Sequence, residues 1–365
     1  MGKKIISPSQ LLAFILLFEF GTALVIPIGL AGGQGVWLSI LIAIPGGILL
    51  FLIYDYLFRQ HPNMIISGYA RQILGKYIGW PLSLLYIPFF MYIASRNLRE
   101  AGDLLVSASY DRTPLFVINA FMIAAVIYVL SKGIEVFARL AEIYLLIMIF
   151  LGIISNALVI FSGLIDFNNL LPLLGDEWKR ILSAAYPNIW LFPFGELVIL
   201  TTILPHLNKG QLAKKTGVIA IIISGLLLSF THALEITVLG GDTYSRATFP
   251  LFTAISLVNI ADFIQRMDAL VMLTLIIGVY FKMTLYCYAA AAVASDLFKL
   301  KKAHQTVVPI AVIVLFFSVI SAGSYPEHAE EGMISISAIL PAFCVIIPLL
   351  LFVVHIIRKR FGLYR

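Results

Sequence analysis

Charged residues are scarce in this chain. Asp, Glu, Lys and Arg make up only 12% of its 365 residues, whereas 61% are hydrophobic and the mean hydropathy is +1.00. A soluble domain carries about a quarter of its residues as charged side chains. The composition therefore excludes a soluble globule and predicts an all-α polytopic membrane protein.

Cysteine is also scarce. Cys287 and Cys344 both lie in apolar runs, which excludes a disulfide framework and indicates small core side chains. The sequence contains no phosphate-binding loop, zinc-ligand spacing or catalytic triad, so we expect no cofactor, no metal and no catalysis. The formal charge of +6 comes from basic residues scattered through short loops, and we therefore expect no nucleic-acid partner.

Long apolar runs dominate the rest of the chain. Those long enough to cross about 30 Å of hydrocarbon predict ten transmembrane helices in one membrane domain over residues 1–365. We expect the first run to be a true span and not a signal peptide, because it is long and lacks a small-residue cleavage site. Residues 63–78 are amphipathic and predict an interfacial helix. The ten expected spans are 10–31, 36–58, 80–106, 113–131, 136–163, 182–205, 213–239, 263–295, 305–323 and 333–357.

The basic residues of the loops predict the orientation. Most Lys and Arg fall in the loops on the side of the N-terminus, and few lie opposite them. By the excess of positive charge in cytoplasmic loops, both termini are expected in the cytoplasm. The opposite loops hold only Arg112, Lys179, Arg180 and Arg246.

The first apolar run contains residues that a plain membrane helix avoids. Between Phe18 and Gly29 it carries Glu19, Gly21 and Pro27. One interpretation is a kinked helix that tolerates one carboxylate. The other is a broken helix, whose freed backbone groups hold a small ligand, because non-helical backbone in a membrane must be buried in protein or line a cavity.

The sixth run carries a matching interruption. Pro187, Pro193, Gly195 and Glu196 lie within it, and two prolines make a regular helix improbable. Paired interruptions in corresponding spans are typical of inverted-repeat transporters that bind substrate between them. We therefore expect a 5+5 repeat, over about 10–163 and 182–357, with a ligand between the two breaks. The backbone and side chains expected at the ligand are those of Gly21, Thr22, Pro193 and Gly195.

Lys282 is the most unusual residue of the eighth span. A lysine at the bilayer centre costs about 2.5–3.5 kcal/mol on insertion scales, so a plain snorkelling or neutral lysine is the less favoured interpretation. We expect it to face the interior, where it either pairs with Glu19 or replaces a sodium ion between the first and eighth spans. Glu196 joins it as a candidate for gating. Tyr286 lies one turn further on the same face, where it either lines a cavity or packs in the core.

Four charged residues cluster in the third span. Arg96 with Glu100 and Arg99 with Asp103 are spaced as i, i+4 pairs, which favours a structural network or an outer gate, with Arg99 as a gating candidate. In the seventh span, His232 is expected to be a satisfied helix-packing histidine, in preference to a proton relay.

Several stretches resemble one known family. They are Gly21 within the first break, Leu74–Gly79, Asp111–Pro114, Asp166–Gly175, Phe249–Pro250 ahead of Ile255–Leu257, Arg266–Asp268 and Ile339–Pro341. The most specific of them is the element Asn168–Gly175 within the fourth stretch. With its length and spans, the chain resembles the B subunits of spore germinant receptors, the GerAB-like spore germination proteins of the amino acid–polyamine–organocation superfamily.

The resemblance implies a LeuT-like fold with broken first and sixth helices. It further implies a small germinant, commonly an amino acid, bound near Gly21, Tyr286 and position 282, and a complex with an A subunit and a lipoprotein C subunit in the spore inner membrane. Lys282 replaces the small polar residue of the amino acid receptors, which leaves room for another ligand or for an ion-surrogate role.

Two further functions stay open on the sequence alone. A free-standing proton-coupled amino acid transporter would use the same scaffold, with Lys282 or Glu196 in the coupling step. A structural membrane subunit without a ligand of its own is the third alternative. None of the three is separated from the others by composition.

Overall fold

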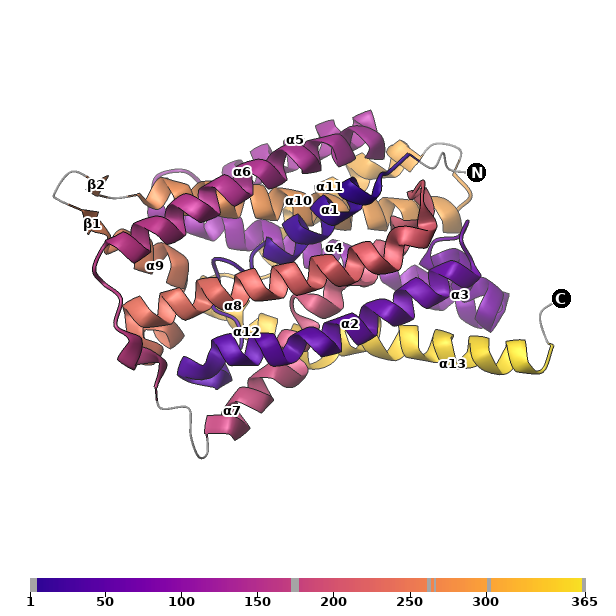
Figure 1. Cartoon of the computed structure of the whole chain (residues 1–365). Coiled ribbons are helices and arrows are strands. Elements are labelled where there is room, and N and C mark those ends of the chain that lie inside the picture. The colour runs from indigo at the N-terminus through magenta and orange to yellow at the C-terminus, as the bar shows by residue number, and fades with distance from the viewer. Residues whose placement is uncertain (1–4, 172–176, 261–263, 266, 301–302, 363–365) are drawn as a thin grey trace.

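The computed structural model describes residues 5–171, 177–260, 264–265, 267–300 and 303–362, most of them in helices that run side by side (Figure 1). A short antiparallel pair, β1 (Asn259–Ile260) and β2 (Ile264–Gln265), lies at the end opposite the two termini. The α-helices are α1 (Pro8–Phe20), α2 (Val36–Gln60), α3 (Ile66–Leu74), α4 (Lys76–Ala108), α5 (Leu115–Lys132), α6 (Ile134–Phe161), α7 (Glu177–Ser183), α8 (Ala213–Arg246), α9 (Pro250–Ser256), α10 (Asp268–Leu297), α11 (Val307–Ile320), α12 (Tyr325–Ile334) and α13 (Ile347–Arg360).

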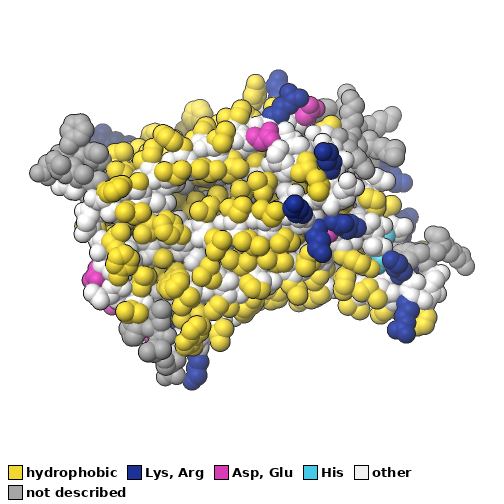
Figure 2. Space-filling model, viewed as in Figure 1, with side chains coloured by type: hydrophobic (Ala, Val, Ile, Leu, Met, Phe, Trp, Pro, Cys, Tyr) yellow, Lys and Arg dark blue, Asp and Glu magenta, His cyan; other side chains and the backbone are white. Residues whose placement is uncertain are grey.

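Seven helical stretches in the described residues are long and apolar enough to cross a membrane. Hydrophobic side chains cover the visible face between the two ends, and most of its Lys and Arg gather at the end that holds the termini (Figure 2). The chain is therefore a multi-pass integral membrane protein. The other apolar runs of the sequence correspond to the shorter helices Pro8–Phe20 and Val307–Ile320 and to the segment 182–205, which is not one continuous helix.

Helix α1 stops in the middle of the first apolar run. It begins with a capping box between Ser7 and Gln10, in which each side chain bonds the other's backbone N–H. It ends at Phe20, and a non-helical stretch follows until the 3₁₀ turn η1 (Leu30–Gly35) leads into α2. The backbone of residues 21–29 therefore has carbonyl and amide groups that no α-helix uses.

The sixth apolar run is divided into short pieces. After α7 come a π-helical turn, η3 (Ala184–Ile189), and two 3₁₀ segments, η4 (Phe194–Thr202) and η5 (Leu204–His206). Pro187 lies inside η3, Pro193 directly precedes η4 and Pro205 lies in η5, and each lacks the N–H that a continuous helix needs. This region lies against α2, and the Tyr54 hydroxyl donates to the Gly195 carbonyl oxygen at 3.2 Å.

The start of the chain is bonded to the end of η5. The backbone N–H groups of Ile5 and Ile6 donate to the His206 carbonyl at 2.9 and 3.1 Å, and Asn208 N–H donates to the Ile6 carbonyl at 2.9 Å. Ile6 and Leu207 thus form a parallel bridge. The segments before the first break and after the second are held together.

Helix α8 bends at Gly240, where φ is +72° and ψ is 159°, a conformation that is essentially restricted to glycine. The bend frees the Thr237 carbonyl, which accepts from the Asp166 N–H and the Asn169 side-chain amide, both at 3.0 Å. Asp166 caps the turn η2 (Phe167–Leu170) and Asn169 lies within it, and both belong to the stretch Asp166–Gly175 of the family resemblance. Residues 172–175 of that stretch lie outside the described residues.

The last apolar run begins with a polar helix. Helix α12 contains Glu327, His328, Glu330 and Glu331, and it continues through two π-helical turns, η8 (Ser335–Ile339) and η9 (Pro341–Ile346), into α13. The sequence pattern predicted a span only from residue 333 onward, because these charges lower the local hydropathy. Helix α12 contributes one wall of the candidate ligand cavity.

Candidate ligand cavity

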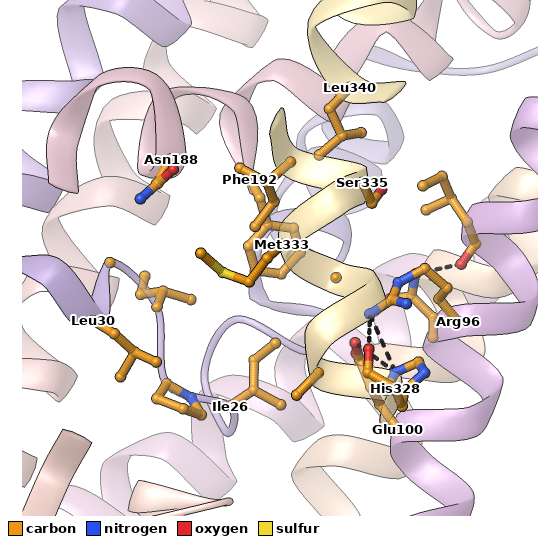
Figure 3. A pocket seen from close by; sticks show the side chains of 18 of the residues that line it. Ile26, Leu30, Arg96, Glu100, Asn188, Phe192, His328, Met333, Ser335 and Leu340 are labelled. Atoms are coloured by element: carbon orange, nitrogen blue, oxygen red, sulfur yellow. Dashed lines mark hydrogen bonds and ion pairs between the residues drawn. The ribbon is translucent and has the colours of Figure 1, made fainter. Parts of the chain in front are cut away.

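A cavity of about 250 Å³ lies where the interrupted segments meet α4 and α12 (Figure 3). The non-helical stretch before and into η1 forms one wall, α4 a second, the η3–η4 region a third and α12 with η8 and Leu340 the fourth. The lining includes Ile26, Ile28, Leu30, Arg96, Asn97, Glu100, Asn188, Phe192, Glu196, His328, Met333 and Ser335.

One side of the cavity is charged. The Arg96 Nη2 donates to the His328 carbonyl at 3.0 Å, while Nη1 lies 3.7 Å from Oε2 of Glu331. His328 Nε2 lies 3.5 Å from Oε1 of Glu100. The expected Arg96–Glu100 ion pair is wrong: among the described residues, Arg96 pairs with Glu331, because α12 brings a closer set of partners to α4. The i, i+4 spacing alone could not reveal this helix.

Several polar atoms in this wall have no hydrogen-bond partner in the described part of the chain. They are Nη1 of Arg96, the Asn97 Oδ1 and the His328 Nδ1, all buried and without a hydrogen bond. A buried polar group without a partner is costly, so such groups indicate where a ligand or water binds. The opposite side is apolar, with Ile26, Phe192 and Met333 (Figure 3). The cavity can therefore hold a small ligand with one polar and one apolar part.

Glu196 connects the cavity with Lys282. The Lys282 Nζ lies 2.6 Å from Oε2 of Glu196, and the two side chains are 0% and 2% exposed. The ammonium also faces the rings of Phe18 and Phe192, with Nζ 5.1 and 4.4 Å from the ring centroids. The structure thus pairs Lys282 with Glu196 and not with Glu19. Within the described residues, neither oxygen of the buried Glu19 has a hydrogen-bond partner.

The other residues expected at the ligand are not part of the cavity lining that the structure describes. Gly21, Thr22, Pro193, Gly195 and Tyr286 are absent from the described lining, whereas the neighbouring Glu196 is part of it. A Cβ on Gly21 would lie 2.6 Å from the Cδ of Lys282, so this glycine lets the first break approach α10 closely. The Tyr286 ring packs 5.4 Å from that of Phe18.

Arg99 lies beside the cavity and not in its described lining. Its Nε donates to Asp103 at 2.7 Å, which confirms that i, i+4 pair, and its Nη1 donates to the Ala322 carbonyl at 2.8 Å. It therefore ties α4 to the chain just after α11.

Sequence reasoning missed His328, Glu331 and the whole α12 wall. The signal was present as Glu327-His328-Ala329-Glu330-Glu331, a charged group directly before an apolar run. Such a group is usually a solvated loop, and only the packing of α12 against α4 gives it another role. The described residues contain no group of three or more His, Cys, Asp or Glu side chains that could hold a metal ion.

Comparisons with known proteins agree with this architecture. The chain is 38% identical to spore germination protein KB of Bacillus subtilis (strain 168), over 99% of this chain and 97% of that protein. It is 24% identical to spore germination protein A2 of the same organism, over 89% of this chain and 87% of that protein.

Among solved structures, the fold is similar to Mhp1, a nucleobase-cation-symport-1 family transporter, in a closed conformation with bromovinylhydantoin bound. The TM-score is 0.63 at 14% identity, covering 90% of this chain and 75% of that one. A family model described as spore germination protein matches residues 5–325. The chain therefore belongs to the spore germination protein family.

Proposed function

We propose that this chain is the membrane B subunit of a spore germinant receptor and that it senses a small nutrient, with an amino acid the first candidate. Its relatives are germination proteins, and its fold is similar to that of a transporter. The proposal includes ten spans in a LeuT-like inverted repeat, with broken first and sixth helices. It also includes A and lipoprotein C subunits as partners, the spore inner membrane as location and cytoplasmic termini.

The observation that carries the proposal is the cavity at the meeting point of both interrupted segments. Arg96 offers a guanidinium to a carboxylate, and two carboxylates lie beside it, Glu331 at 3.7 Å from Arg96 Nη1 and Glu100 at 3.5 Å from His328 Nε2. A wall with charges of both signs suits a zwitterion, and the apolar side suits its side chain. In this arrangement Gly21, Thr22, Pro193, Gly195 and Tyr286 form the layer that supports the wall.

Lys282 would serve as a fixed cation next to Glu196. A permanent ammonium at this position would remove the need for a metal ion between the first break and α10. Ligand binding would then favour one of two conformations of the cavity walls, by the difference in its affinity for the two.

Asn97 offers a sharp test of the cavity. Its side-chain amide donates to the Ile93 carbonyl at 2.7 Å and leaves Oδ1 without a hydrogen bond in the described part of the chain. Asn156 in α6 makes the same kind of bond, to the Gly152 carbonyl at 2.7 Å, and is not part of the described cavity lining. In spores, Asn97→Leu should raise the half-maximal germinant concentration by roughly two- to tenfold, the effect of one lost hydrogen bond. Asn156→Leu should leave it unchanged.

The measurement is loss of refractility across a panel of amino acids, nucleosides and sugars, with subunit abundance checked by immunoblot. An unchanged response of Asn97→Leu at normal abundance would place ligand recognition in another subunit.

A proton-coupled amino acid transporter is the second candidate, favoured by the fold and by the buried Glu19, Glu196 and Lys282. The purified protein in liposomes with an imposed pH gradient separates the two. Uptake of a labelled amino acid that depends on the gradient and is lost in Glu196→Gln would establish transport.

A further inference from the structure

A second buried polar cluster holds the first break from the other side. His232, Glu235 and Tyr244 of α8 are all at most 1% exposed. The Nε2 of His232 lies 2.9 Å from the Ala23 carbonyl oxygen. The Tyr244 hydroxyl lies 3.4 Å from both the backbone N and the carbonyl O of Ile28. These are backbone groups of the non-helical stretch 21–29, and Ile28 lines the cavity.

The hydrogen bonds of this cluster fix where its protons must be. A carbonyl oxygen only accepts, so Nε2 of His232 must carry a hydrogen. The other ring nitrogen, Nδ1, lies 2.9 Å from Oε2 of Glu235, and this contact also needs a hydrogen between the two atoms. The pair therefore holds one proton more than a neutral imidazole with a free carboxylate. It is either imidazolium with carboxylate or imidazole with carboxylic acid.

We propose that His232 and Glu235 form a proton-binding site and that its proton fixes the stretch 21–29 against α8. With the proton bound, Nδ1 of His232 is hydrogen-bonded to Glu235 and accepts no hydrogen from Tyr244. The Tyr244 hydroxyl then donates to the Ile28 carbonyl. Without the proton, the lone pair of Nδ1 faces a carboxylate and takes the Tyr244 hydroxyl, whose oxygen lies 3.0 Å away. The Ile28 carbonyl then loses its donor, although the Ile28 N–H still donates to the Tyr244 oxygen, so the attachment of this cavity wall to α8 is weakened.

The neighbours of His232 support a site of one proton. The titratable groups that act on it in the described part of the chain are Glu235 and Tyr244, both from α8, and the contacts from the facing stretch are made by backbone groups. No described lysine or arginine pairs with Glu235. The bend at Gly240 makes the cluster possible, because it turns Tyr244 back toward His232. This inference rests on the geometry of α8 and does not depend on the proposed function.

The test is hydrogen exchange of the stretch 21–29 in the purified full chain in detergent, at about pH 6 and about pH 9, on either side of the usual range of histidine titration. Glu235→Gln is the informative variant, because its amide donates to Nδ1 permanently and has no proton to lose. The ratio of wild-type to Glu235→Gln exchange cancels the intrinsic pH dependence of the chemistry. Glu135→Gln, at an exposed ion pair of α6, is the matched control.

We expect the ratio of wild-type to Glu235→Gln exchange to be near one at the lower pH. At the higher pH we expect wild-type exchange to be about tenfold faster than that of the variant, the effect of losing a buried hydrogen bond. Tyr244→Phe should raise exchange at both values, since it removes the bonds to Ile28 whatever the proton does. An equal wild-type to Glu235→Gln ratio at the two pH values would overturn the proposal. If Glu235→Gln fails to fold, the wild-type protein alone decides, through the exchange rate of residues 21–29 divided by that of residues 213–225 of α8. A value of this quotient that is the same at both pH values would overturn the proposal.

Discussion

Lys282 and Glu196 are the pair of residues whose removal has the clearest expected effect. Both are buried, and their charged atoms lie 2.6 Å apart. Replacing one member of a buried pair leaves the other charge without compensation, which costs about 3–5 kcal/mol, whereas replacing both with neutral side chains is often tolerated. Comparing the single with the double substitution therefore shows whether each residue serves only to compensate the charge of the other or has a separate role.

Lys282→Met alone is expected to lower the thermal unfolding temperature in detergent and the amount of protein in the membrane. Lys282→Met combined with Glu196→Gln should recover most of both, because no unpaired charge remains. Immunoblotting and thermal unfolding of the two variants check this. A double variant as unstable as the single one would show that Lys282 has another partner, and the unpaired Glu19 would be the first to consider.

The residues also show where sequence reasoning ends. The intramembrane charges Glu19, Glu196 and Lys282 could be identified as unusual from hydropathy alone, because a charge is costly in any apolar run. The sequence could not show which of the two carboxylates pairs with the lysine, because the distances depend on how α1, η4 and α10 pack. His232 was expected to be a packing histidine, and its bond to Ala23 became visible only once the first run was seen to leave the α-helix at Phe20.

Among the elements, α8 shows how a local bend serves distant parts of the chain. Gly240 allows the bend, Asp166 and Asn169 bond the carbonyl that it frees, and Tyr244 beyond it reaches Ile28. The long apolar run predicted a helix from 213 to 239 and could not predict that the chain continues in helical form to Arg246. The charged α12 was missed for the related reason that hydropathy identifies lipid contact and not burial in protein.

Gly240→Ala is expected to reduce the free energy of unfolding by about 1–3 kcal/mol, the cost of holding a residue with a Cβ in this backbone conformation. Space is not the cause, since the new Cβ would lie 3.6 Å from the nearest atom, Oδ1 of Asn169. Gly152→Ala in α6 is the control, because nothing lies within 4 Å of its Cβ and alanine favours a helix by roughly 0.5–1 kcal/mol. Unfolding midpoints in detergent compare them, and an equal loss in both would contradict the backbone argument.

For the whole molecule, the positions of the apolar runs and of the basic residues were sufficient to predict a multi-pass membrane protein. Both ends of the described chain lie at the end of the bundle where α3 is found (Figure 1). The arrangement of the walls around the cavity was not predictable, because it depends on contacts between helices far apart in the sequence. Composition carries no information on such contacts.

The proposed orientation, with both termini in the cytoplasm, can be checked with single cysteines. The native Cys287 and Cys344 are buried, so they offer little background. A cysteine at Phe167, which is 70% exposed in the loop after α6, should react with a membrane-impermeant maleimide in intact cells. A cysteine at Tyr77, which is 94% exposed at the start of α4, should react only after permeabilisation. The reverse pattern would place both termini outside.

The backbone bridge between Ile6 and Leu207 links the two interrupted segments outside the cavity. Helix α1 begins directly after one strand of this bridge, and η5 ends directly before the other. A displacement of either segment along its axis is therefore transmitted to the other through three backbone hydrogen bonds, without any side chain taking part. A partner subunit that binds at this end of the bundle would receive a single combined movement, carried by backbone groups.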